Sequence, residues 1–303
     1  MELWIVAGIL SALIITFSNF VDQYVGRQFF PAHPVNQTLT NGAVYFIFLI
    51  PFGLFYPDVF DGAFHIIMLT TLCGLLLLAG VLPYFMALQK KNADQAVPLV
   101  QTMPIFIAFF AWVMLGETLT ALELVSGFII VFGAMGMLFD FHNRSFAFSV
   151  AGLMLLSTLI HAFDNTLIRL FATTMTWQFV TFWVLFGMCL GSWIMLLVFP
   201  SRRRFIMNVI KKSDGHVLLW NTVLQFTDVL AILFFVMAMS LAPSAAHVAF
   251  VAGTQPLFLL VVGWLLARVL PAYFRAETPD SHIVYQFAFA GLILVGLYLL
   301  TKS

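Results

Sequence analysis

Long apolar runs alternate with short polar connectors along the whole chain. A helix needs about 20 predominantly apolar residues to cross the hydrocarbon core of a bilayer. On that criterion the sequence predicts ten membrane-spanning helices, near residues 2–28, 37–56, 64–88, 93–116, 119–139, 147–171, 176–199, 216–241, 244–269 and 282–301. We therefore expect an all-α polytopic membrane protein.

One long charged connector, "SRRRFIMNVIKKSDG", separates the seventh and eighth predicted spans. Its apolar residues recur at helical spacing, at Phe205, Ile206, Val209 and Ile210. This pattern predicts a short helix that lies on the membrane surface. A solvated basic loop is an equally good interpretation of the same residues.

One polar pattern occurs twice inside the apolar runs. "SNFVDQYVGR" at 18–27 and "IHAFDNTLIR" at 160–169 each place an arginine five residues after an aspartate, at an offset of 142. The two pairs are Asp22 with Arg27 and Asp164 with Arg169. A chain that otherwise avoids charge therefore repeats one charged motif in both halves.

A second alignment supports an internal repeat. "QTMPIFIAFFAWVML" at 101–115 aligns with "GTQPLFLLVVGWLLA" at 253–267, so that Pro104 matches Pro256 at an offset of 152. We interpret residues 1–140 and 147–303 as two units of five helices. Because five is odd, the second unit enters the membrane inverted, and inverted repeats are typical of transporters.

Composition narrows the class of protein further. The chain is 62% hydrophobic and 9% charged, whereas a soluble domain has roughly 25% charged residues. Its net charge of zero gives no electrostatic footprint for nucleic acid. Cys73 and Cys189 both lie in apolar runs, so we expect no disulfide framework and no metal site. The sequence has no Walker A pattern, and we expect no cofactor.

Several short motifs resemble an EamA-type member of the drug/metabolite transporter superfamily. They are "SNFV" in the first span, Pro-x7-Trp in the fourth, "LGETLT" at 115–120 and the glycines of the fifth span. The second half has "LAR" at 266–268 in place of "LGE". The resemblance implies a ten-helix secondary carrier, most often an exporter, with a central cavity lined by both halves. It also implies a bacterial cytoplasmic (inner) membrane location, and a connector or helix-terminus contact for Glu117.

Charge and resemblance predict opposite orientations. Connectors on one side of the membrane hold eleven basic residues, and the other side holds two, Arg169 and Lys302. The positive-inside rule then places both termini outside the cytoplasm. The usual arrangement of the family that the chain resembles places both termini inside.

Asp228 is the strongest candidate for a binding residue. A charged side chain at the bilayer centre costs about 2.5–3.5 kcal/mol on insertion scales, and Asp228 lies near the middle of the eighth span. Asn221, Gln225 and Asp228 recur at i, i+4 and i+7, which places two amides and a carboxyl group on one helix face. We expect these residues to bind substrate or a coupling proton; the alternative is a hydrogen-bonded cluster that only joins helices. His247, Gln101 and Gln255 are further candidates for the same site.

A second group of residues has the character of a gate. Asp22 and Asp164 lie in the last third of helices that cross in opposite directions, so we expect them near opposite faces of the membrane. Arg27 and Arg169 should each extend to the nearer interface. His161 lies three residues before Asp164 on the same face, where it could relay a proton. An alternative for both aspartates is a plain interfacial position.

Pro104 and Pro256 are candidate hinges. Each should open the hydrogen-bond ladder inside its helix, because the ring lacks a donor and clashes with the preceding turn. A fixed bend is the alternative.

These features predict a secondary transporter, not an enzyme. Its substrate would be a small neutral, zwitterionic or cationic metabolite such as an amino acid or amine, moved by alternating access, either with proton coupling or by facilitated diffusion. Two alternatives remain open: a membrane-embedded enzyme, although the Gly-x-Gly-Asp context of intramembrane aspartyl proteases is absent, and a non-transporting receptor or assembly subunit. The expected partners are a small-molecule substrate and membrane lipids, with no nucleic acid; the sequence does not indicate the oligomeric state.

Overall fold

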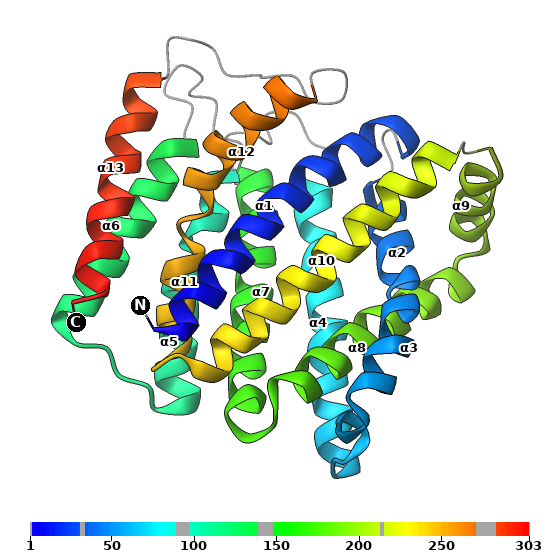
Figure 1. Ribbon diagram of the computed structural model, residues 1–303, viewed down its shortest axis with the longest axis horizontal. Helices are drawn as coiled ribbons and strands as arrows, with labels where there is room; N and C mark the ends of the chain where they lie inside the picture. Colours follow the sequence, from blue (N-terminus) through cyan, green and yellow to red (C-terminus); the bar gives the residue numbers. More distant parts are fainter. Residues whose placement is uncertain are drawn as a thin grey trace.

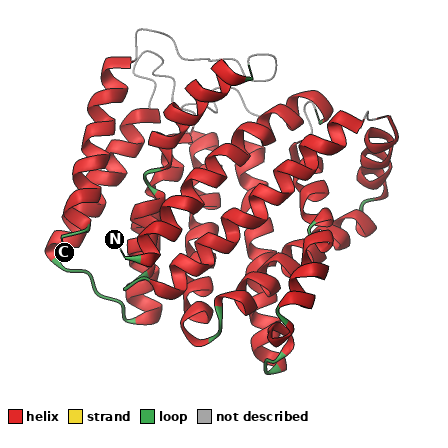
Figure 2. Ribbon diagram, viewed as in Figure 1, coloured by secondary structure: helices red, strands yellow, loops and turns green. Residues whose placement is uncertain are grey.

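The computed structural model is all-helical. It describes residues 2–30, 34–88, 97–138, 148–212, 215–270 and 283–302, and within these ranges it contains no strand (Figure 2). The first half contributes α1 (Leu3–Phe29), α2 (Pro34–Val44), α3 (Phe46–Phe55), the 3-10 helix η1 (Pro57–Phe60), α4 (Phe64–Leu88), the 3-10 helix η3 (Val97–Thr102), α5 (Met103–Leu115) and α6 (Ala121–Leu138). The second half contributes α7 (Phe148–Thr174), α8 (Trp177–Val198), α9 (Pro200–Lys212), α10 (Gly215–Leu241), α11 (Ala245–Ala252), α12 (Gln255–Val269) and α13 (Ile283–Leu300).

Most of these helices have the length and composition of membrane spans. Nine segments of the described ranges are long and apolar enough to cross a membrane, and α13 supplies a shorter apolar helix, Tyr285–Leu300, where the tenth span was predicted. Three of the nine consist of two consecutive helices: α2 with α3, η3 with α5, and α11 with α12. The all-helical multi-pass prediction is therefore confirmed.

We expected Pro104 and Pro256 inside continuous helices, but both lie where one helix of a span ends and the next begins, and their role as hinges stays a prediction. Each lies in the first turn of a new helix, α5 or α12, after the span has already broken. Proline suits that position, because the missing N–H would have no partner in the first turn of a helix. The residues that precede the two helices, Thr102 and Thr254, have nearly the same backbone angles, φ −79° and ψ −6° against φ −78° and ψ −6°.

Helices of the first half pack mainly on helices of the second half. In Figure 1, α1 lies along α10, α6 lies along α13, and α2 lies against α8. In the same way, α4 packs along α7, and α5 contacts α11. The core of the bundle is therefore shared between the two halves.

The helices α4 and α8 approach each other very closely through two glycines. A Cβ atom on Gly74 would lie 2.0 Å from the backbone oxygen of Val184. A Cβ atom on Gly187 would lie 2.1 Å from the backbone oxygen of Thr71. Small residues permit this kind of helix contact in membrane proteins, where van der Waals packing drives association.

The basic connector between α8 and α10 forms a helix. Its residues form α9, with Ile206 only 4% exposed in a cluster that includes Val25 and Leu196. Arg202 donates a hydrogen bond to Asn36 Oδ1 on α2 at 3.0 Å. The helix prediction for this segment is confirmed, and the alternative of a loop is wrong.

Candidate functional site

A polar cluster lies where α1, α2 and α10 meet. Asp228 is residue 14 of the 27 in α10, and its Oδ1 accepts a hydrogen bond from the hydroxyl of Ser18 on α1. The hydroxyl of Tyr45, between α2 and α3, donates to Asp228 Oδ2 at 3.4 Å. Both carboxyl oxygens of this mid-helix aspartate are thus engaged by the other half of the chain.

Asp22 belongs to the same cluster. The amide of Gln37 on α2 donates to Asp22 Oδ1 at 2.7 Å and to the Asp22 backbone oxygen at 2.8 Å. Asn41, one turn later, donates to Asp22 Oδ1 at 3.3 Å. The carboxyl groups of Asp22 and Asp228 are close enough to interact electrostatically. We call this group the Asp228 cluster; its members are Ser18, Asp22, Gln37, Asn41, Tyr45, Asn221, Gln225 and Asp228.

The amides of the Asp228 cluster have unused hydrogen-bonding capacity. Gln225 is 0% exposed, and neither its amide nitrogen nor its amide oxygen has a partner among the described residues. The same holds for the side-chain oxygens of Asn41 and Asn221. A buried polar group without a partner costs about 1–3 kcal/mol, so an unpaired group calls for a reason. A bound polar molecule that pairs with these amides would supply one.

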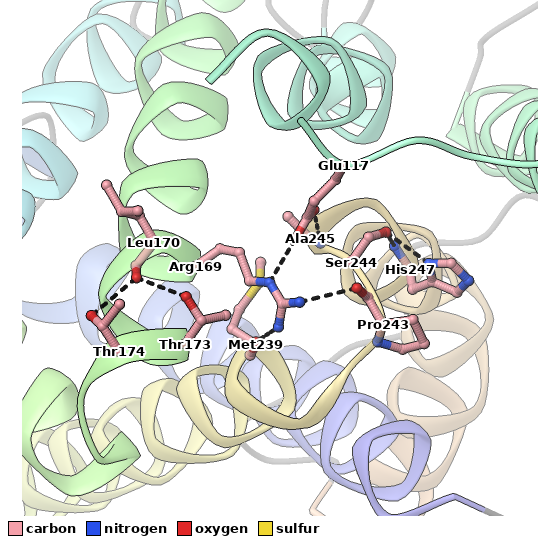
Figure 3. A network of polar contacts seen from close by, with 10 residues as sticks. All are labelled: Glu117, Arg169, Leu170, Thr173, Thr174, Met239, Pro243, Ser244, Ala245 and His247. Carbon is pink, nitrogen blue, oxygen red and sulfur yellow. Dashed lines mark hydrogen bonds and ion pairs between the residues drawn. The ribbon is translucent and has the colours of Figure 1, made fainter. Parts of the chain in front are cut away.

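A second polar cluster is formed by Glu117 and Arg169 (Figure 3). Arg169 Nε lies 2.8 Å from Glu117 Oε1, and the two side chains are 7% and 14% exposed. Arg169 also donates to the backbone oxygens of Met239 and Pro243, the latter at 3.1 Å. Glu117 Oε2 accepts a hydrogen bond from the backbone N–H of Ala245 at 2.7 Å. This ion pair therefore joins α7 and the α5–α6 connection to the junction of α10 and α11.

His247 extends this second cluster. Its Nε2 lies 3.2 Å from Glu123 Oε1, and its Nδ1 lies 2.7 Å from the Ser244 hydroxyl. The His247 ring also packs edge-on against Trp4, with ring centroids 5.6 Å apart. We call this group the Glu117–Arg169 cluster; its members are Glu117, Glu123, Arg169, Ser244, Ala245 and His247.

The structure separates His247 from Asp228, although the sequence had grouped them. His247 contacts Trp4 at the start of α1, whereas Asp228 contacts Ser18. Those two α1 residues are fourteen positions apart, which corresponds to about 21 Å along a helix. Gln101 and Gln255, both partly buried, lie at the end of η3 and at the start of α12.

The sequence "LGETLTALE" explains the position of Glu117. Gly116 ends α5 with a positive φ of 68°, a conformation that glycine adopts without strain. Thr120 and Glu123 then exchange hydrogen bonds of 3.2 and 2.6 Å between side chain and backbone, a capping box that starts α6. The carboxylate of Glu117 binds the N-terminus of α11, where the helix dipole favours negative charge. The expected helix-terminus contact of Glu117 is confirmed.

The expectation for Arg169 was wrong. We expected its side chain to extend to the membrane interface, but the residue is only 6% exposed. Glu117 and two backbone oxygens provide the polar environment that an interface would otherwise supply. Arg27, by contrast, is exposed near the end of α1.

Asp164 and His161 face α4 from α7. Asp164 is 0% exposed and interacts electrostatically with the Cys73 thiol of α4. The His161 ring lies against Gly80 of α4, and a Cβ atom there would be 2.9 Å from the ring. Neither residue belongs to the two clusters described above.

Sequence reasoning missed several members of the clusters. Ser18, Gln37, Asn41 and Tyr45 were not among the candidates, nor was Glu123. The stretch "NQTLTNG" at 36–42 is the one signal that was available, because it places Gln37 and Asn41 one helical turn apart in a predicted span.

A cavity of about 380 Å³ adjoins the Glu117–Arg169 cluster, and Glu117 is one of its lining residues. Its lining is mainly apolar and includes Ile105, Trp112, Phe128 and Phe250. Trp112 and Phe128 are 60% and 57% exposed, as expected for side chains that face lipid. The cavity does not include the Asp228 cluster.

Comparison with known proteins gives two findings. The model of a family described as the EamA-like transporter family matches residues 2–139. A solved structure titled "Crystal structure of protein" is similar with a TM-score of 0.69 and 16% sequence identity, covering 99% of this chain and 96% of that one. At this identity the similarity shows a common fold. No curated protein sequence matches the chain.

The family match covers α1 to α6 and includes Glu117 and the "LGE" motif. The apolar helices described above are those of an integral multi-pass membrane protein. The match over residues 2–139 places the first half of the chain, α1 to α6, with the EamA-like family of the drug/metabolite transporter superfamily, a superfamily of membrane transporters.

Proposed function

We propose that the protein is a secondary transporter that exports a small neutral, zwitterionic or cationic metabolite, such as an amino acid or amine, by alternating access. The observation that carries this proposal is the Asp228 cluster, in which a mid-helix carboxyl group occurs together with amide groups whose buried atoms are partly or wholly unpaired among the described residues. Polar groups inside a membrane bundle typically mark substrate or ion pathways.

The chemistry of the cluster indicates the substrate class. Asp22 and Asp228 provide two carboxyl groups that can accept hydrogen bonds from an ammonium group. Gln225, Asn221 and Asn41 provide amides that can pair with a carboxylate, a hydroxyl or an amide. An amine or amino acid uses both kinds of group, whereas an anion would have to bind beside two carboxyl groups.

The packing of the helices supports two inverted repeats, residues 1–140 and 147–303, with ten spans. The first span of each half packs on the third span of the other, α1 on α10 and α7 on α4. Each remaining span packs on its own counterpart in the other half: α2 on α8 for the second spans, α5 on α11 for the fourth, and α6 on α13 for the fifth. A two-fold rotation that exchanges the halves preserves all these pairs. The matching backbone at Thr102 and Thr254 supports the same relation. Broken helices at equivalent positions are a feature of alternating-access carriers.

The Glu117–Arg169 cluster supports a gate. It fastens α7, α10, α11 and the α5–α6 connection at the end of the bundle where α1 begins (Figure 1). The Asp228 cluster lies about 21 Å further along α1. Access to that cluster from the Glu117 end would require the ion pair to separate. Four further residues remain candidates for gating: Asp22, Arg27, His161 and Asp164.

We propose that the protein is located in the bacterial inner membrane.

A ligand-stabilisation screen tests the proposed binding chemistry. Amino acids, amines and organic anions would be added to purified protein in detergent, and the melting temperature would be measured. We expect an amino acid or amine to raise the melting temperature of the unsubstituted protein and of Asp61→Asn, a control at an exposed carboxyl group. The same solute should have little effect on Gln225→Leu. Stabilisation by anions alone would contradict the assigned substrate class.

A further inference from the structure

Asp164 is a buried carboxyl group without a conventional hydrogen-bond donor. The residue is 0% exposed, and neither carboxyl oxygen has a partner among the described residues. The Cys73 thiol lies beside it, but that thiol donates to the Leu69 backbone oxygen at 3.5 Å within α4. The environment of Asp164 therefore provides one weak and already engaged donor.

The nearest arginine along α7 is also engaged elsewhere. Arg169 directs Nε to Glu117, Nη1 to Met239 and Nη2 to Pro243. His161 lies one turn before Asp164, with its ring against Gly80. Among the titratable groups of the described helices packed on α7, Cys73 is the one that interacts electrostatically with Asp164. No described cation balances a charge at this position.

The equivalent aspartate in the first half has a different environment. Asp22 accepts hydrogen bonds from Gln37 and Asn41. At the offset of 142 that relates Asp22 to Asp164, those two amides correspond to Phe179 and Trp183. The Trp183 indole N–H donates to the Val59 backbone oxygen at 2.8 Å. The second half has thus kept the carboxyl group and replaced both of its donors with aromatic residues.

An ionised carboxylate at this position would be very costly. Burial of a charge without a counter-ion or donors costs several kcal/mol, and a membrane bundle offers no bulk water to offset it. Protonation removes the charge, and the neutral group then needs only one acceptor for its O–H.

We propose that Asp164 is a proton-binding site that holds its proton in the closed conformation and exchanges it when the Glu117 end opens. The proton adds to a carboxylate oxygen from water and returns to water, so no other reactant is needed. Asp164 lies five residues from Arg169, about 7.5 Å along α7, so separation of the Glu117–Arg169 pair would admit water close to it. This access step rests on the proposed alternating-access function, whereas proton binding by Asp164 does not.

Infrared spectroscopy of the purified protein in lipid tests both parts. We expect the carbonyl-stretch band of a protonated carboxyl group at neutral pH in the unsubstituted protein and in Asp61→Asn. The band should be lost or reduced in Asp164→Asn and should shift in frequency in Asp164→Glu, which retains a carboxyl group. If the difference between the unsubstituted protein and Asp164→Asn contains carboxylate bands instead, Asp164 is ionised and the proposal is wrong.

Transfer to heavy water separates the access step from proton binding. The downshift of the carbonyl band on deuteration should be slow in the unsubstituted protein and at least tenfold faster in Glu117→Gln, where the ion pair is lost. Equal rates in the two proteins would overturn the access step. That result would leave proton binding by Asp164 intact if the carbonyl band still depended on Asp164.

Discussion

Arg169 and Glu117 form a buried ion pair, with 2.8 Å between Arg169 Nε and Glu117 Oε1, and both partners also bind the junction of α10 and α11. Arg169 comes from the second half of the chain and Glu117 from the "LGE" motif of the first half. The pair therefore joins the two halves at one end of the bundle. Separation of this one ion pair would therefore release α7, the α5–α6 connection and the junction of α10 and α11 from one another.

Loss of Arg169 should destabilise the protein. Arg169→Met would leave the Glu117 carboxylate buried without its partner and would remove the donor to the backbone oxygens of Met239 and Pro243. The free energy of unfolding should fall by about 3–5 kcal/mol. Denaturant unfolding in detergent would measure this loss. The exposed α9 residue Arg203 provides the control, because Arg203→Met should cost less than about 1 kcal/mol. Equal effects of the two substitutions would show that the ion pair contributes no specific stability.

Loss of Glu117 should open the end of the bundle that the pair closes. Ser244 is 4% exposed, so a Ser244→Cys thiol should react slowly with a membrane-impermeant reagent. Adding Glu117→Gln should speed labelling by tenfold or more, because Arg169 and the α11 N-terminus lose their shared anion. Cys73 and Cys189 are buried, and the protein without the Ser244→Cys substitution measures how much reagent these two native thiols take up. Labelling that stays equally slow would argue against a gate at this end.

Replacement of Gly116 by any other residue should lower the stability of the protein. Its φ of 68° lies in the left-handed region, where a residue with a Cβ atom pays about 1–2 kcal/mol. Gly116→Val should therefore lower the melting temperature, whereas Gly152→Ala, at a helical position with no atom within 4 Å of an added Cβ, should not. Substrate affinity per folded molecule should stay unchanged in both variants, because Gly116 acts through chain geometry.

The sequence was sufficient to predict the spans but not the partners of their polar residues. Apolar runs determine where helices cross a bilayer, so the segments near 64–88 and 176–199 agree closely with α4 and α8. The partner of Arg169 is 52 residues away in the chain, and no local spacing indicates it. The same applies to Ser18 and Asp228, which are 210 residues apart.

Two neighbouring predictions show where local rules fail. Proline in a predicted span indicates a broken helix, yet Pro104 and Pro256 follow the break, because consecutive helices begin afresh there. His247 and Asp228 lie on successive spans, yet the second half of α10 separates them. In both cases tertiary structure decides between local options that the sequence leaves open.

The orientation of the chain is open to a direct test. The charge bias of eleven basic residues to two places both termini outside the cytoplasm. A C-terminal fluorescent fusion that folds only in the cytoplasm should therefore stay dark, whereas a fusion to an enzyme active only outside the cytoplasm should be active. A bright fluorescent fusion would reverse the orientation.

Transport by purified protein in liposomes tests the central claim most directly. Vesicles would be loaded with the amino acid or amine that stabilises the protein, and exchange with labelled solute outside would be measured. We predict exchange in the unsubstituted protein and in Asp61→Asn, and loss of at least nine-tenths of it in Asp228→Asn at equal folded protein. The amide is nearly isosteric and can still accept a hydrogen bond from Ser18, so folding should hold. No exchange by the unsubstituted protein of any amino acid or amine, or full exchange in Asp228→Asn, would contradict the account.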